Sequence, residues 1–123
     1  MASPLLVSIV DDDESVRESL PDLIGEFGFA AQVFSSAEAF LESRYVDQTG
    51  RLILDVAMPG MSGLELQQVL ERQGRDIPIV FITAHGNAAS RARAISQGAA
   101  GYLLKPFSAA DLLDALNGAL VSK

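Results

Sequence analysis

Reactive side chains stand directly after four short apolar runs of this chain. Asp11-Asp12-Asp13 follow the first run, and Asp55, Thr83 and Lys105 follow three others. Carboxylates that lie close together repel one another, so a cation or a proton must balance them. Mg²⁺ suits such a group, because it commonly takes one or two carboxylates, water and a substrate phosphate. An ammonium and a hydroxyl would add donors for phosphoryl oxygens, and one carboxylate could act as nucleophile. The residue types therefore indicate a phosphoryl site.

These side chains can meet only if the apolar runs are strands of one sheet. Short runs rich in branched residues alternate five times with stretches of helical spacing. The expected strands cover residues 5–10, 30–34, 52–54, 78–83 and 100–104. The expected helices cover residues 16–27, a segment from Ser35 or Ser36 to about 43, and residues 64–73, 88–97 and 109–120.

Alternating strands and helices predict a parallel sheet with helices on both faces. A chain of 123 residues is too short for an eight-stranded barrel. We therefore expect an α/β fold: an open, doubly wound sheet of five parallel strands with five helices. Function lies at the carboxyl ends of the strands in such sheets. Adjacent strands are about 4.8 Å apart, so the first three of these groups, up to Thr83, can share one pocket if their strands are neighbours.

Three local features carry expectations of their own. Asp13 stands where it would cap the first helix, and Pro21 should kink that helix because it removes one backbone hydrogen bond. Ser35 and Glu38 have the spacing of a capping box.

The composition excludes several classes of function. The chain has no cysteine, so thiol catalysis, disulfides and Cys-ligated metals are excluded. Its net charge of −7 argues against direct contact with nucleic acid or an anionic membrane surface. No apolar run approaches the roughly 18 residues of a membrane span, and the N-terminus lacks the pattern of a signal peptide. We expect a single cytoplasmic domain over residues 1–123, with a core at about 5–120.

Each candidate residue also has an ordinary structural interpretation. An aspartate run after a strand is usually a turn or a helix cap, and a lone Asp55 before a Pro/Gly loop is usually a turn residue. Thr83 alone is an ordinary strand end, and Lys105 alone is usually a solvated charge. A polar group at each of four strand ends is much rarer by chance, and the combination carries the functional interpretation.

The chain resembles the receiver domains of two-component response regulators. The resemblance covers residues 5–120 and rests on four motifs in the expected order and spacing. They are Val10-Asp11-Asp12, the segment DVAMPGMSG at residues 55–63, Thr83-Ala84 and Lys105-Pro106-Phe107. The segments SAEAFL at 36–41 and MSGLEL at 61–66 further resemble FixJ-like regulators. The family implies strand order 2-1-3-4-5, as in flavodoxin and CheY.

The resemblance implies a role for each site residue. Asp55 would be the phosphoacceptor that takes a phosphoryl group from the phosphohistidine of a sensor histidine kinase. Asp12, Asp55 and the backbone carbonyl of Ala57 would bind Mg²⁺, and Asp11 would assist through water. Lys105 would hold a phosphoryl oxygen.

The resemblance also implies a switch. Thr83 would move to donate to the phosphoryl group, and Tyr102 would turn inward as it moves. Lys105–Pro106 would be a cis peptide bond. The face of the fourth helix and fifth strand would then regulate an output domain or partner, transcription being the expected output, and would form a homodimer after phosphorylation.

Other functions remain open at this point. An aspartyl-phosphate phosphatase of the haloacid-dehalogenase type would want a second aspartate where Ala57 stands, and a cap domain. A flavodoxin-like electron carrier would want a hydroxyl- and glycine-rich loop in place of Asp11-Asp12-Asp13. A degenerate receiver would lack some of the residues that are present here. We expect a phosphoacceptor rather than an enzyme, limited to self-phosphorylation and autodephosphorylation, and a receiver cut from a longer regulator rather than one that stands alone.

Overall fold

The computed structural model describes residues 5–121, with side chains as far as residue 118. Strands and helices alternate along the chain. In order they are β1 (Leu6–Val10), α1 (Glu14–Glu26), β2 (Ala30–Phe34), α2 (Ala37–Glu42), the 3₁₀ helix η1 (Val46–Gln48), β3 (Thr49–Asp55), α3 (Gly63–Arg72), β4 (Ile79–Thr83), α4 (Ala88–Ser96), β5 (Gly101–Leu104) and α5 (Ala109–Val121).

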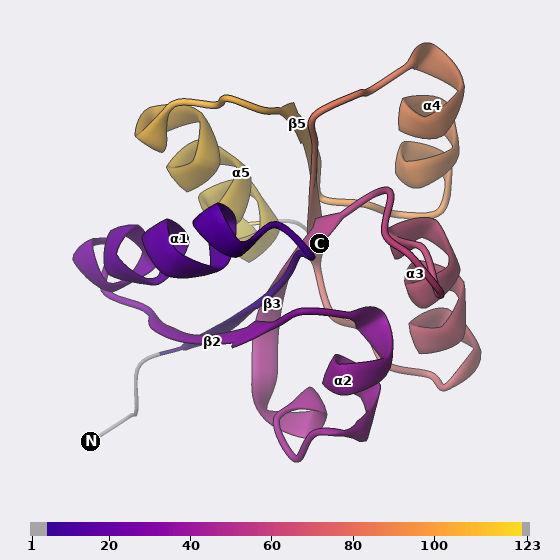
Figure 1. The fold of residues 1–123 in the computed structure, drawn as a ribbon, viewed down its shortest axis with the longest axis horizontal. Helices are drawn as coiled ribbons and strands as arrows, with labels where there is room; N and C mark the ends of the chain where they lie inside the picture. Colours follow the sequence, from indigo (N-terminus) through magenta and orange to yellow (C-terminus); the bar gives the residue numbers. More distant parts are fainter. Residues whose placement is uncertain (1–4, 122–123) are drawn as a thin grey trace.

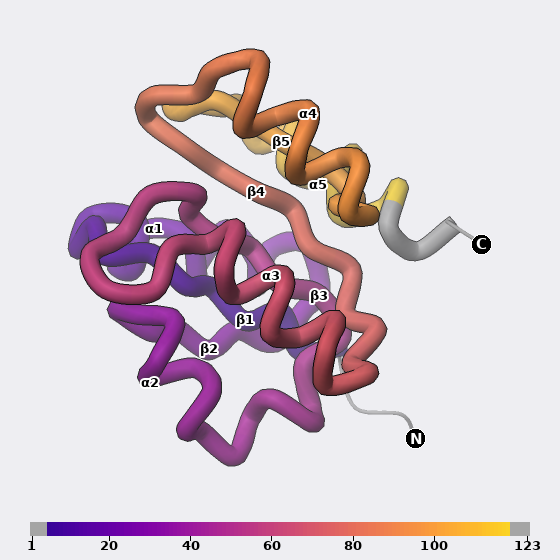
Figure 2. Tube along the Cα trace, turned by 90° about the vertical axis from the view of Figure 1, so that its right-hand side faces the viewer, coloured from indigo at the N-terminus to yellow at the C-terminus, as the bar shows by residue number. Residues whose placement is uncertain are grey.

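The five strands form one parallel sheet in the order β2-β1-β3-β4-β5. Helices α1 and α5 cover one face, and α2, α3 and α4 cover the other (Figure 1). The tube in Figure 2 follows the same arrangement from the side. The expected doubly wound α/β fold is confirmed. All five strands end at one edge, and the site lies there.

Side-chain alternation explains why the central strands are apolar throughout. In β3, Leu52 and Leu54 pack with the α2, α3 and α4 side, whereas Ile53 packs with the α1 and α5 side. In β4, Phe81 and Ile82 divide in the same way. Successive side chains of a strand point to opposite faces, so a strand covered on both faces needs apolar residues at every position.

Strand β3 begins three residues earlier than expected, at Thr49. The Thr49 hydroxyl lies 2.7 Å from that of Ser8 on the neighbouring strand, and it donates to the carbonyl of Tyr45 at 2.7 Å. These bonds satisfy a polar residue that is 8% exposed. A strand that begins with polar residues has no apolar periodicity at its start, so the sequence did not predict that β3 begins at Thr49. The 3₁₀ helix η1 gives no periodic pattern either, and it was not predicted.

Helix α1 is capped as expected. The Asp13 carboxylate accepts a hydrogen bond from the Ser15 amide at 3.0 Å, and Gly28 takes a φ of +94° just after the helix. Hydrogen bonds from the Ser15 hydroxyl and amide hold the pKa of Asp13 below its usual value. Pro21 lies inside the helix, which continues through it to Glu26.

The capping box expected at Ser35 and Glu38 is wrong. Ser36 is the N-cap of α2, and its hydroxyl accepts from the Ala39 amide at 3.0 Å. The Glu38 carboxylate instead accepts from a backbone amide in the loop before α3. A complete capping box is present at Ser62 and Glu65, at the start of α3.

In the part of the chain that the structure describes, no helix is both long and apolar enough to cross a membrane.

Candidate phosphoryl and metal site

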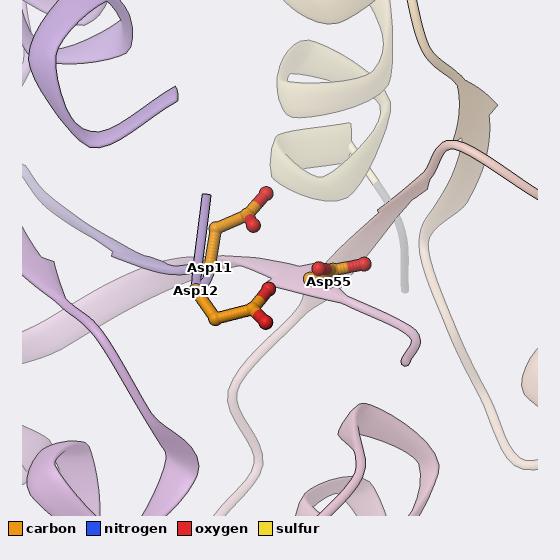
Figure 3. A group of neighbouring side chains, drawn as sticks. All are labelled: Asp11, Asp12 and Asp55. Carbon is orange, nitrogen blue, oxygen red and sulfur yellow. The ribbon is translucent and has the colours of Figure 1, made fainter. Parts of the chain in front are cut away.

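Three aspartates meet where β1 and β3 end. Asp11 and Asp12 follow β1, and Asp55 is the last residue of β3, its neighbour in the sheet. One carboxylate oxygen from each lies within 4.8 Å of the others, and Figure 3 shows the side chains gathered from the two strand ends. Asp11 is fully buried and Asp55 is 6% exposed, whereas Asp12 is open to solvent. The sequence therefore predicted this cluster correctly.

The turn after β1 fixes the orientation of Asp11. Its amide donates to the carbonyl of Phe34 at 3.1 Å, and its own Oδ1 accepts from the Asp13 amide at 2.9 Å. The guanidinium of Arg17 donates to its backbone carbonyl at 3.0 Å. Asp13 is used as a helix cap, so the acidic run supplies two carboxylates to the cluster rather than three.

Lys105 supplies the positive charge of the site. It follows β5, and its Nζ lies 2.8 Å from Asp11 Oδ2. Its amide donates to the carbonyl of Thr83 at 2.8 Å, and the Lys105–Pro106 bond is cis, as the resemblance implied. Burial lowers the pKa of Lys105, but the carboxylates of Asp11, Asp55 and Asp13 outweigh burial and raise it above the usual value. The side chain is therefore a permanent cation.

Asp55 is the group that the site perturbs most. Burial is the first cause and the neighbouring Asp11 carboxylate the second; together they raise the pKa of Asp55 from 3.8 to about 7. Lys105 and the backbone amide of Ala57 act in the opposite direction. One ammonium does not balance three carboxylates, so the cluster favours either a proton or a further cation. All of its donors are oxygens, and these fit a hard divalent ion such as Mg²⁺.

Thr83 is the last residue of β4, and Tyr102 lies on β5, the next strand of the sheet. Thr83 is 2% exposed, and its hydroxyl accepts from the His85 amide at 3.2 Å. The ring of Tyr102 lies 6.4 Å from that of Phe81, and its hydroxyl is 2.6 Å from the Ser90 hydroxyl on α4. Ser90 was not predicted from the sequence, because nothing local distinguishes this serine from the others.

Gly86 is a second residue that was not predicted from the sequence. A β-carbon at this position would lie 2.5 Å from Leu104 Cδ2, 3.1 Å from the Tyr102 hydroxyl and 3.2 Å from Thr83 Cγ2. The glycine therefore leaves room for three side chains next to the pocket. Its place three residues after an expected strand end could have suggested a close approach.

A groove beside the site separates α1 from the segment after β5. Its apolar lining includes Val16, Leu20 and Leu23 from α1 and Pro106 and Phe107 from the other side. Asp13 and Lys105 line its end toward the carboxylates. The groove thus offers an apolar surface that leads to a charged pocket.

Comparisons with known proteins agree with this geometry. The family model for the response regulator receiver domain matches residues 7–117. The response regulator protein TodT of Pseudomonas putida is 43% identical over 115 residues, which are 94% of this chain and 51% of TodT. The chain thus spans about half the length of this curated relative.

Solved structures give the same result. The response regulator StyR superimposes with a TM-score of 0.87 and 48% identity, over 96% of this chain and 60% of that one. FixJ-N superimposes with a TM-score of 0.84 and 37% identity, over 96% and 94%. These matches confirm the likeness to FixJ-like receiver domains that the four motifs indicated.

Proposed function

The chain belongs to the response regulator receiver domain family, and on this premise we propose that Asp55 accepts a phosphoryl group from the phosphohistidine of a sensor histidine kinase. The observation that carries the proposal is the position of Asp55. It stands at a strand end beside two further carboxylates, and the Lys105 ammonium lies 2.8 Å from one of them, that of Asp11. Receiver domains are phosphoacceptors in two-component signalling, and these residues supply the chemistry for that role.

In the transfer, a carboxylate oxygen of Asp55 attacks the phosphorus. The bond from phosphorus to the imidazole nitrogen of the kinase breaks, and that nitrogen leaves with the electron pair. The product is an acyl phosphate on Asp55. Only the ionised carboxylate is a nucleophile, so a proton that the pocket favours at pH below about 7 must first be displaced.

Other residues at the site bind the metal ion and the phosphoryl group. We assign Mg²⁺ to the carboxylates of Asp12 and Asp55 and the carbonyl of Ala57, with Asp11 acting through water. When bound, the ion supplies positive charge that neutralises the carboxylates and the phosphoryl oxygens. Lys105 breaks its ion pair with Asp11 and holds a phosphoryl oxygen instead.

The proposed switch runs from Thr83 to the face of α4 and β5. The phosphoryl group brings up to about two negative charges and three acceptor oxygens. Thr83 turns its hydroxyl from the His85 amide toward them, and the Tyr102 ring moves into the space that Thr83 leaves. Tyr102 then gives up its bond to Ser90, which couples the event to α4.

This face is where we expect the domain to act on its output. Leu104 is 58% exposed there, and Ile95 on α4 is 44% exposed. We propose that the phosphorylated face forms a homodimer or contacts an output domain that controls transcription. The groove between α1 and Pro106-Phe107 is the proposed contact for the kinase, because Lys105 lines it and also pairs with Asp11 in the carboxylate cluster.

We propose that residues 1–123 form one cytoplasmic receiver domain with its core at 5–120. The domain makes no direct contact with nucleic acid and none with a membrane. Its own chemistry is limited to self-phosphorylation and autodephosphorylation. The exposed side chain of Ala57 is small, so it offers little cover for the acyl phosphate against water.

Mass spectrometry after incubation with acetyl phosphate tests the proposal. The wild type should gain one phosphoryl group with Mg²⁺ present and none with a chelator. Asp55→Asn should gain none in either case. An unmodified wild type, or an adduct that persists in Asp55→Asn, would exclude Asp55 as the phosphoacceptor. Multiple turnover of an added phosphomonoester would favour a phosphatase instead.

A further inference from the structure

Glu38 makes a contact that its place in the sequence does not suggest. It lies in the first turn of α2 and is exposed, and Ser36 rather than Glu38 satisfies the start of the helix. Its Oε2 accepts a hydrogen bond from the Met61 amide at 3.0 Å, 23 residues along the chain. The carboxylate therefore joins α2 to the loop between β3 and α3.

This loop connects Asp55 to α3 and contains Ala57. Its two ends are held locally: the Gly63 amide donates to the Val56 carbonyl at 2.9 Å, and Ser62 caps α3. Met58 inserts its side chain into the core. In the range 5–121, the hydrogen bond that fastens the Gly60-Met61 turn to another element is the one that the Met61 amide donates to Glu38.

The backbone at Gly60 is adapted to this contact. Its φ is +73°, a conformation that side chains rarely allow, and a β-carbon there would lie 2.8 Å from Glu38 Oε2. The glycine thus permits both the turn and the close approach of the carboxylate. Two independent features of the loop converge on Glu38.

The core holds helix α2 in place beside this contact. Ala37 and Phe40, on either side of Glu38, are fully buried, and the Phe40 ring packs edge-on against Phe34 at 5.3 Å between centroids. The Glu38 backbone is therefore held by the core although its side chain is exposed. The hydrogen bond between the Met61 amide and Glu38 can therefore hold the loop against a helix that is itself fixed.

We propose that Glu38 is a positioning residue for the phosphoryl site. It holds the β3–α3 loop so that the backbone of Ala57 keeps its place beside Asp55. The inference rests on the proposed function, in which the Ala57 carbonyl binds Mg²⁺. The backbone amide of Ala57 also acts to lower the pKa of Asp55, so a loosened loop disturbs the nucleophile as well as the metal.

Three variants of the same chain test the proposal. Glu38→Ala removes the acceptor, and Glu38→Gln removes the charge but keeps an acceptor oxygen. Glu42→Ala removes an exposed carboxylate from the other end of α2. Two quantities are measured in each: hydrogen exchange at the Met61 amide by NMR, and the Kd for Mg²⁺ by calorimetry.

The expected result separates the contact from the charge. In Glu38→Ala, Met61 should exchange about 10-fold faster, as expected when a charge-assisted hydrogen bond is lost. The Kd for Mg²⁺ should rise about 10-fold, at the lower end of what loss of an outer-shell contact costs. Glu38→Gln should restore most of the slow exchange at Met61 and most of the Mg²⁺ affinity. Glu42→Ala should match the wild type in both quantities.

Either of two results would overturn the proposal. One is an unchanged Kd in Glu38→Ala; the other is a Glu38→Gln variant as weak as Glu38→Ala, which would assign the effect to net charge. Neither readout requires phosphorylation. A wild type that binds Mg²⁺ but takes no phosphoryl group would therefore refute the proposed function and leave the role of Glu38 to be judged by these measurements.

Discussion

Strands β3 and β5 flank β4, yet they differ in how tightly they are packed. Every residue of β3 except Gly50 is buried, whereas no residue of β5 is buried. β3 carries Asp55, and β5 carries Tyr102 and leads into Lys105. The proposed phosphoacceptor is thus held in the buried centre of the sheet, while the proposed readout lies on a partly exposed edge. A charge added at Asp55, which the core holds in place, can then be accommodated only by movement of β5.

The largest expected contrast is in core packing. Leu54→Ala in β3 should lower the free energy of unfolding by about 3 kcal/mol, because it leaves a cavity. Leu104→Ala in β5 should change it by less than about 0.5 kcal/mol, because that side chain is 58% exposed. Urea denaturation measures both. Equal losses would remove the difference between the two strands.

A contrast between metal and phosphoryl ligands comes next. Asp12→Ala should raise the Kd for Mg²⁺ about 100-fold, since a direct ligand matters at least as much as an outer-shell partner. Lys105→Ala should leave the affinity unchanged or tighter, because it removes a cation from the same pocket, yet it should lose most signalling. Calorimetry and a phosphorylation-dependent reporter measure the two. Weaker Mg²⁺ binding in Lys105→Ala would contradict its assignment to the phosphoryl group.

Two glycines test whether the buried centre tolerates crowding less than the partly exposed edge. A β-carbon on Gly63 would collide with the backbone carbonyl of Asp55, which cannot easily move. Gly63→Ala should therefore cost about 2 kcal/mol. In Gly86→Ala the nearest atom is the flexible end of Leu104, so the cost should be less than about 1 kcal/mol. Thermal unfolding compares them, and the reverse order would refute the comparison.

In the absence of metal, the free energy of unfolding should also depend on pH. The pKa of Asp55 is about 7 in the folded state against 3.8 ordinarily, so the unfolded chain ionises first as the pH rises. Stability should fall between these two values and level off above about 7. Asp55→Asn lacks this titration, so its Tm should exceed that of the wild type increasingly up to neutral pH.

The control for that measurement is Asp22→Asn, which changes an exposed aspartate of α1. Its Tm should follow the wild type at every pH, measured by circular dichroism with a chelator present. A difference between Asp55→Asn and wild type that stays constant with pH would show that the pocket does not perturb Asp55.

The sequence predicted the sheet and the site because both follow from strong, simple signals. Apolar runs covered on both faces marked β1, β3 and β4, and a parallel sheet brings the residues after them to one edge. Asp11, Asp55 and Lys105 could therefore be grouped from the order of residues along the chain. Family resemblance added the cis bond at Pro106 and the strand order.

The features that were missed all depend on tertiary contacts. Adjacent serines at 35 and 36 offer two capping positions, and the sequence does not say which is used. Glu38 therefore looked like half of a capping box, although its partner is a loop amide far along the chain. Ser90 and Gly86 matter only because β5 brings Tyr102 and Leu104 beside them.

Amide NMR spectra with and without beryllofluoride and Mg²⁺ test the central claim most directly. Beryllofluoride can stand in for the phosphoryl group on a carboxylate. In the wild type, shifts should appear around Asp55 and extend through Thr83 to Tyr102 and α4, with little change in β2. Asp55→Asn should show none of them. A wild-type spectrum that does not change, or shifts that are equally large in Asp55→Asn, would contradict the claim that a charge placed on Asp55 is read at β5.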